Sequence, residues 1–70
     1  MINLTEKLKI AMIKQNVTQT TLAANAGQSQ GNLANKLIRN DFKLSDYQKL
    51  VEALGCTLEL NIVLPNGERI

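Results

Sequence analysis

Histidine is absent from the 70-residue sequence, and Cys56 is its only cysteine. One thiol cannot form an intramolecular disulfide, and this composition lacks the ligands of a Cys/His metal site. A core of this size stabilises a fold by only about 3–5 kcal/mol, so association of two copies is the remaining common source of stability. We expect Cys56 to be a small buried apolar residue in a reducing, cytoplasmic compartment, with a redox sensor as the alternative.

Long apolar runs and the usual catalytic motifs are also missing. The apolar runs fall short of the ~18 residues that cross a membrane, and residues 1–6 lack the charged-then-apolar order of a secretion signal. The chain has no Gly-rich phosphate loop, no nucleophile elbow and no histidine base. We therefore expect neither an enzyme nor a membrane protein, and no cofactor or metal.

Charge is present but unevenly distributed, although the net charge is only +2. Residues 7–43 contain six Lys or Arg residues and one carboxylate, Asp41. Residues 44–70 contain two cations and four carboxylates. A polyanion would therefore be attracted to the first part of the chain, and the alternative is a basic face that is only solvated.

Four segments with amphipathic spacing and a helix-start signal occupy the first 55 residues. A side-chain oxygen at the start of each segment can accept a hydrogen bond from a free backbone N–H. The predicted helices with their N-caps are 4–15 after Asn3, 19–25 after Thr18, 30–39 after Ser29, and a fourth that starts at Ser45 and ends at Leu54. Gln48 completes a capping box with Ser45. Asn16, Gly27 and Gly55 are placed to end helices in a left-handed or tight conformation.

After Gly55 the spacing of the apolar residues changes from helical to alternating. This period of two predicts one half-buried strand, and the apolar side of that strand consists of Cys56, Leu58, Leu60, Ile62 and Leu64. The Pro-Asn-Gly sequence at 65–67 predicts a turn, in which Asn-Gly favours a two-residue hairpin loop. Residues 68–70 are long enough only for a short returning segment. The chain is therefore expected to be mainly α, with a helical domain at 1–55 and a C-terminal strand or short hairpin at 56–70.

The predicted strand would leave backbone N–H and C=O groups unpaired along its edges. A lone hairpin is marginally stable in water, so we expect the strand to pair antiparallel with the same strand of a second copy. Such an isologous contact is the commonest arrangement in homo-oligomers. The dimerisation residues would be Leu58, Leu60, Ile62 and Leu64. The alternative is a hairpin that packs on the fourth helix of its own chain.

Residues 18–37 have the spacing of a helix-turn-helix, in which two helices are joined by a short turn that often contains Gly. Gly27 lies in the predicted turn, and Ala23 is small where the second helix would cross the first. The apolar residues expected to hold the two helices together are Leu22, Ala26, Leu33 and Leu37. The second helix could then enter the DNA major groove, which is about 12 Å wide.

The motif resembles the helix-turn-helix family of phage Cro proteins and repressor N-terminal domains. The matching residues are Thr18, Gln19, Leu22, Ala23, Gly27, Ser29, Gln30 and Leu33, and the resemblance extends over roughly residues 4–55. Two features depart from the family pattern. Lys36 stands where the family has an apolar residue, with Leu37 one position later, and a predicted strand replaces the usual fifth helix.

The resemblance implies a sequence-specific contact with double-stranded DNA through residues 29–39. It also implies that Gln19 bonds a phosphate and braces Gln30. Side-chain amides can bond adenine in two places, and the predicted base contacts are Gln30, Gly31, Ala34 and Asn35. The predicted phosphate contacts, which position a protein without reading sequence, are Gln19, Ser29, Asn32, Lys36, Arg39 and Lys43. The alternative is an amide-rich face that is only solvated.

The sequence therefore predicts a homodimeric transcriptional regulator, a repressor of the phage or mobile-element type, bound to a pseudo-palindromic operator. Two alternatives stay open. One is an antitoxin that represses its own operon and binds a toxin partner. The other is a protein-interaction module without DNA binding.

Overall fold

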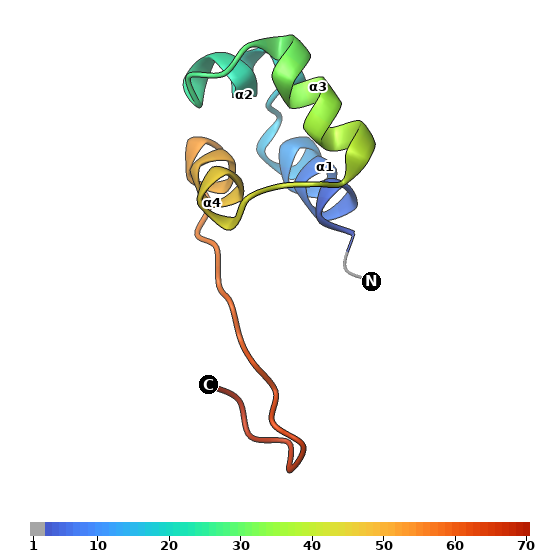
Figure 1. Ribbon diagram of the computed structural model, residues 1–70. Helices are drawn as coiled ribbons and strands as arrows, with labels where there is room; N and C mark the ends of the chain where they lie inside the picture. Colours follow the sequence, from blue (N-terminus) through green and yellow to red (C-terminus); the bar gives the residue numbers. More distant parts are fainter. Residues whose placement is uncertain (1–2) are drawn as a thin grey trace.

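The computed structural model describes residues 3–70, and within this range the chain forms four helices (Figure 1). They are α1 (Leu4–Gln15), α2 (Gln19–Asn25), α3 (Gln30–Arg39) and α4 (Leu44–Ala53). The helices gather at one end of the molecule, and residues 56–70 extend away from them (Figure 1). We call residues 3–55 the helical body and residues 56–70 the C-terminal arm. The mainly helical prediction is confirmed.

The first three helices begin and end where their capping residues predict. The side-chain oxygens of Asn3, Thr18 and Ser29 accept hydrogen bonds from the backbone N–H three residues on, at 2.9, 3.2 and 3.2 Å. Asn16 follows α1 with φ +55°, and Gly27 follows α2 with φ +71°. A side-chain cap and a left-handed end residue satisfy the backbone groups that a helix leaves free at its two ends.

Helix α4 differs from the prediction at its start. It begins at Leu44, its N-cap is Lys43, and no side chain caps it. Ser45 therefore lies in the first turn, and the predicted capping box with Gln48 does not form. The backbone explains the shift, because the N–H of Tyr47 bonds the carbonyl oxygen of Lys43 at 2.9 Å. The helical hydrogen bonds thus start before the residue that the capping rule selects.

The four helices share one core. Each contributes one fully buried leucine, and these residues are Leu8, Leu22, Leu33 and Leu50. The other buried side chains are Met12, Ala23, Leu37, Tyr47, Val51 and Leu54. Burying a leucine stabilises a fold by about 1.5–3 kcal/mol relative to leaving it exposed. The core therefore lies wholly within the helical body.

Helix α1 closes the body through polar contacts with segments far along the chain. The hydroxyl of Thr5 donates to the carbonyl of Leu37 at 2.7 Å, and its backbone N–H donates to Asn40 Oδ1 at 3.0 Å. Tyr47 donates its hydroxyl hydrogen to the carbonyl of Leu4 at 3.0 Å. These bonds fix the start of α1 against α3 and α4, so α3 is held on a rigid support.

The arm contains no strand within residues 56–70, and the strand prediction is therefore not supported. Ile62 and Ile70 exchange two backbone hydrogen bonds of 2.9 and 3.0 Å, around a single bridge between Val63 and Arg69. A strand requires a partner segment for its ladder of hydrogen bonds. The return, residues 68–70, supplies that partner only for the last residues before the turn. The short return itself agrees with the sequence prediction.

The turn of the arm also differs in type from the prediction. The N–H of Gly67 bonds the carbonyl of Leu64 at 2.9 Å, and Gly67 has φ +89°. A turn followed by a left-handed glycine makes a three-residue hairpin loop rather than the two-residue loop expected from Asn-Gly. The arm does not fold back on α4, as the alternative prediction had it, but extends away from the body (Figure 1).

Two smaller predictions can be checked against the same structure. Cys56 is only partly buried at the junction of body and arm, with its sulfur 3.9 Å from the carbonyl oxygen of Leu54. Among the described residues, no helix is both long and apolar enough to cross a membrane.

Candidate nucleic-acid interface

Helices α2 and α3 pack closely across the turn formed by residues 26–29. Ala23 is buried between them, and the N–H of Gln28 bonds its carbonyl at 2.9 Å. Gly27 supplies the left-handed residue that reverses the chain after α2. The two helices are therefore joined by a short turn that contains Gly27, and Leu22 and Leu33 are buried in the same core cluster.

One side of α3 faces the core and the other faces solvent. Leu33 and Leu37 are buried, whereas the exposed positions of the helix are Gln30, Gly31, Asn32, Asn35, Ile38 and Arg39. Ala34 is half-buried between the two sides. A Cβ added at Gly31 would meet no atom within 4 Å, so the helix surface is open there. Three of the four predicted base contacts are thus exposed.

Sequence reasoning missed Ile38 on this exposed side. The residue is 82% exposed, and a helical period of ~100° per residue places it between Gly31 and Ala34 on the wheel. That period was available from the sequence. Ile38 was missed because an apolar residue next to Leu37 resembles part of the buried stripe.

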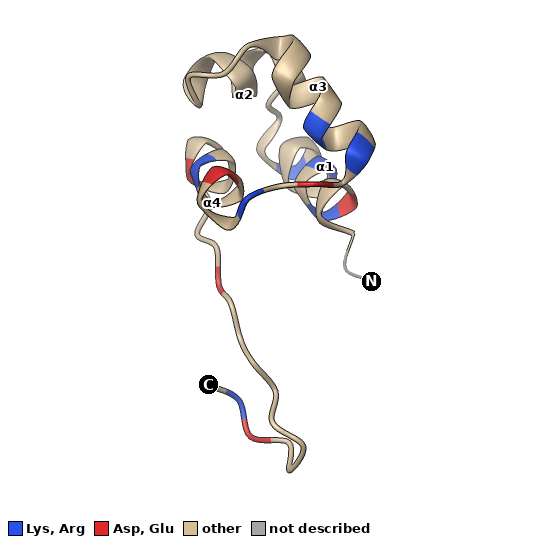
Figure 2. Ribbon diagram, in the orientation of Figure 1, with Lys and Arg blue, Asp and Glu red and all other residues tan. Residues whose placement is uncertain are grey.

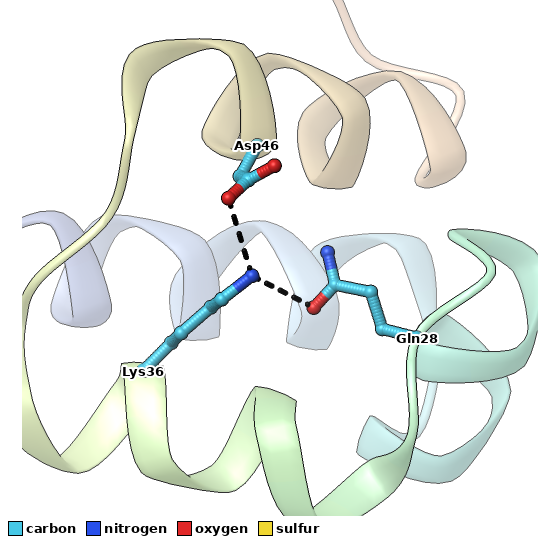
Figure 3. Close-up of polar contacts among 3 residues, drawn as sticks. All are labelled: Gln28, Lys36 and Asp46. Carbon is cyan, nitrogen blue, oxygen red and sulfur yellow. Dashed lines mark hydrogen bonds and ion pairs between the residues drawn. The ribbon is translucent and has the colours of Figure 1, made fainter.

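Lys36 is oriented differently from the prediction that made it a phosphate contact. Figure 3 shows its side chain reaching toward the start of α4. Its Nζ lies 3.3 Å from Asp46 Oδ2 and donates to Gln28 Oε1, also at 3.3 Å. In the Cro and repressor family that the motif resembles, this position has an apolar side chain. In this chain the ammonium is satisfied by a carboxylate and an amide instead.

A cleft of ≈ 410 Å³ lies between α3, the connection that follows it, and the start of α4. Its lining residues are Asn32, Asn35, Lys36, Arg39, Asp41, Lys43 and Asp46. The cleft unites four of the six predicted phosphate contacts with the predicted base contact Asn35. Asp41 and Asp46 were not among the predicted site residues, although their acidic charge beside a basic segment was visible in the sequence.

The cations of the cleft differ in their partners. Within residues 3–70 the contact between Lys36 and Asp46 is the only ion pair. Arg39 and Lys43 are exposed, and no carboxylate pairs with either of them in the part of the chain that the structure describes. Figure 2 shows these cations at the end of α3 and at the start of α4. An anion that approaches this side therefore meets two cations without an ion pair, together with the carboxylate of Asp41, which also lines the cleft.

The remaining predicted phosphate contacts lie near the start of α2 and α3, outside the lining of the cleft. Ser29 accepts a hydrogen bond from the N–H of Asn32, which leaves its own hydroxyl hydrogen available. Gln19 is half-buried at the first position of α2. Its side chain makes no hydrogen bond to any residue of the described range, so the implied bracing of Gln30 is not present in the free chain.

Two of the four predicted dimerisation residues are exposed on the arm, whereas Leu58 packs against the core of the helical body. Leu60 is 69% exposed and Ile62 is 59% exposed, while Leu58 and Leu64 are half-buried. Val63 and Ile70 are also exposed, although the alternation assigned Val63 to the polar side. The arm therefore presents apolar side chains on both of its sides.

Comparison of the chain with protein-family models, with curated proteins and with solved structures found no match. Among the described residues, no cluster of three His, Cys, Asp or Glu side chains could hold a metal ion. The function is therefore argued from the geometry of α3, the cleft and the arm.

Proposed function

We propose that this protein is a sequence-specific regulator that binds double-stranded DNA as a homodimer, with α3 in the major groove. The observation that carries the proposal is the exposed amide-rich side of α3, next to the unpaired cations Arg39 and Lys43. A helix fits the major groove, and specific proteins combine base contacts with contacts to the phosphates beside them.

Base recognition is assigned to the first six residues of α3. Gln30 and Asn35 are exposed there, and the amide of either residue can both donate to and accept from adenine. Gly31 stands between them with open space at its missing Cβ, which permits a close approach of a base or of the DNA backbone. Ala34 completes the surface as a small residue that does not block this approach.

Phosphate binding is assigned to the residues around the base-reading surface. Arg39 and Lys43 supply charge from one end of the cleft, and Asn32 supplies an uncharged donor beside them. Ser29 and Gln19 extend the phosphate surface toward the starts of α3 and α2. These contacts orient α3 on DNA but do not distinguish one sequence from another.

Dimerisation is assigned to the arm. Its exposed apolar side chains and the backbone of residues 57–61 lack a partner within residues 56–70, and pairing with the arm of a second copy would supply both. Each arm would then become a strand, although it is none in the isolated chain. A two-fold dimer with its α3 helices about 34 Å apart would match two half-sites one DNA turn apart.

The proposal is tested by selecting bound fragments from a random pool of DNA duplexes. We expect a pseudo-palindromic sequence, and binding whose affinity falls linearly with salt on logarithmic axes, by about 0.9 per phosphate contacted. Absence of binding to any duplex at low salt would contradict the proposal and favour an interaction module without DNA.

The role of α3 is tested with Asn35→Ala. We expect operator binding to weaken by about 1–3 kcal/mol and one base position to lose its preference. Gln48→Ala is the matched control, because Gln48 is an exposed amide on α4 outside the cleft lining. A loss that is equal for all DNA sequences would assign Asn35 to the DNA backbone instead.

A further inference from the structure

The ion pair between Lys36 and Asp46 lies in the cleft that the proposed function gives to DNA phosphates. Lys36 comes from α3 and Asp46 from the first turn of α4, and the side chain of Gln28 comes from the turn before α3 (Figure 3). Arg39 and Lys43 line the same cleft. One of its three cations is therefore bound internally, while the other two are not.

This internal pairing matters because phosphate affinity depends on the number of available cations. Each cation that neutralises a phosphate adds to the sequence-independent part of the binding free energy and makes it more sensitive to salt. An ammonium bound to a carboxylate must leave that partner before it can neutralise a phosphate. Asp46 thus lowers the number of charges that the cleft offers to any DNA.

From this geometry we infer that Asp46 limits the sequence-independent part of DNA affinity and its salt dependence, because it withholds the Lys36 ammonium from phosphates. The inference rests on the proposed DNA-binding function. Withholding one non-specific contact weakens binding to all sequences, whereas the base contacts of α3 favour only the operator. Because a phosphate contact carries no sequence information, it changes both affinities by the same factor and leaves the ratio of operator to non-specific affinity unchanged.

Lys36 itself is then a positioning residue and not a phosphate ligand. Its ammonium connects the turn, α3 and α4, and so helps to fix the orientation of the exposed side of α3. The side chains of Lys36 and Asp46 are 28% and 30% exposed. Pairs this accessible to water contribute little to folding stability, so either residue can be changed without unfolding the body.

The inference is tested with Asp46→Asn, by measuring affinity for the selected operator and for a random-sequence duplex at several salt concentrations. We expect the logarithmic salt dependence to steepen by about 0.9, which makes the gain in affinity about 3.5-fold larger at 50 mM than at 200 mM salt. The gain should apply to both duplexes alike, so the ratio of operator affinity to random-duplex affinity should stay unchanged.

Glu52→Gln is the matched control, because it removes the same charge from an exposed position of α4 outside the cleft lining. We expect it to leave the salt dependence unchanged. An equal steepening in this control would mean that net charge alone causes the effect, and it would overturn the inference.

Lys36→Met, alone and combined with Asp46→Asn, identifies the group through which Asp46 acts. We expect Lys36→Met to leave the salt dependence as in the wild type, and Asp46→Asn to have no effect in its presence. A salt dependence that Lys36→Met reduces by about 0.9 would make Lys36 a phosphate ligand and contradict the inference. An effect of Asp46→Asn that persists without Lys36 would show simple repulsion of phosphate by Asp46.

The wild-type protein separates failure of the inference from failure of the proposed function. If the wild type binds no duplex, the proposed function is wrong. If the wild type binds with the expected salt dependence, and Asp46→Asn has the same affinity and the same salt dependence, only the inference is wrong. Thermal unfolding of each variant, followed by circular dichroism, checks that the helical body remains folded.

Discussion

Leu33 in the helical body and Leu60 in the arm are the same residue type with opposite environments. Leu33 is fully buried, and Leu60 is 69% exposed. The body provides four helix faces that meet, so a leucine on any of them reaches an apolar neighbour. The arm is a single extended segment with a short return, and of its apolar residues only Cys56 and Leu58, at its start, pack against the core of the body. An apolar pattern thus specifies which side of a segment seeks burial, but a second surface must exist to bury it.

The sharpest test of this contrast is the pair Leu33→Ala and Leu60→Ala. We expect Leu33→Ala to lower the free energy of unfolding of the body by about 2–5 kcal/mol, because it leaves a cavity in the shared core. In a protein of this size that loss unfolds most of the molecules. Leu60→Ala should change the stability of the monomer by less than about 0.5 kcal/mol. Urea unfolding at a protein concentration low enough to keep the chain monomeric checks both values.

The next test addresses the arm as a dimer contact. We expect Leu60→Pro to abolish dimers, because proline removes the backbone N–H that a ladder between two arms requires. Leu60→Ala keeps that N–H and should raise the dimer dissociation constant about 10²- to 10⁴-fold, as expected for the loss of one buried apolar side chain from each of the two copies. Sedimentation equilibrium measures the constant. A folded Leu60→Pro dimer with wild-type affinity for DNA would show that the arm is not the interface.

A smaller effect distinguishes two serines of the body. Ser29 caps α3 through its side chain, whereas Ser45 lies in the first turn of α4 and caps nothing. We expect Ser29→Ala to cost about 1 kcal/mol of stability, and Ser45→Ala to change stability by less than about 0.5 kcal/mol. Thermal unfolding of the two variants measures the difference. Equal losses of stability in the two variants would indicate that Ser45 caps α4, as the sequence predicted.

The last test uses pH and the only tyrosine, which belongs to the body. Desolvation by burial raises the pKa of the Tyr47 hydroxyl above its ordinary value of 10.0. The unfolded chain therefore ionises first, so the stability that this burial provides is present below pH 10 and is lost as the pH rises through the folded pKa. We expect Tyr47→Phe to unfold with a weaker pH dependence above pH 10. Identical alkaline profiles of the two proteins would exclude Tyr47 as the group responsible.

Local signals were the most reliable part of the sequence. Asn3, Thr18 and Ser29 start the helices that follow them, and Asn16 and Gly27 adopt the left-handed conformation expected at helix ends. Each of these assignments depends on hydrogen bonds within a few residues. The exposure of Asn35 was predictable for a similar reason, because helical periodicity places it opposite Leu33.

The sequence patterns were poor guides where contacts with a distant segment, or hydrogen bonds of the neighbouring residues, determined the structure. Ser45 satisfies the capping rule, yet the hydrogen bond from Tyr47 to Lys43 starts α4 earlier. Lys36 has the position of a solvent-facing cation, but Asp46 in another helix binds it. The alternating arm lacks a strand because a ladder requires a partner that its own chain provides for only a few residues.

The sequence by itself determined four helices, their first and last residues in three cases, and which side of α3 faces solvent. These features depend on caps and on the helical repeat, which act over one or two turns. Only the tertiary structure decided that Lys36 binds Asp46 and Gln28, and that the exposed apolar residues of the arm beyond Leu58 are not covered by the body. Those outcomes depend on which segments come within about 4 Å of one another, the separation at which side chains make contact, and a linear sequence does not state that distance.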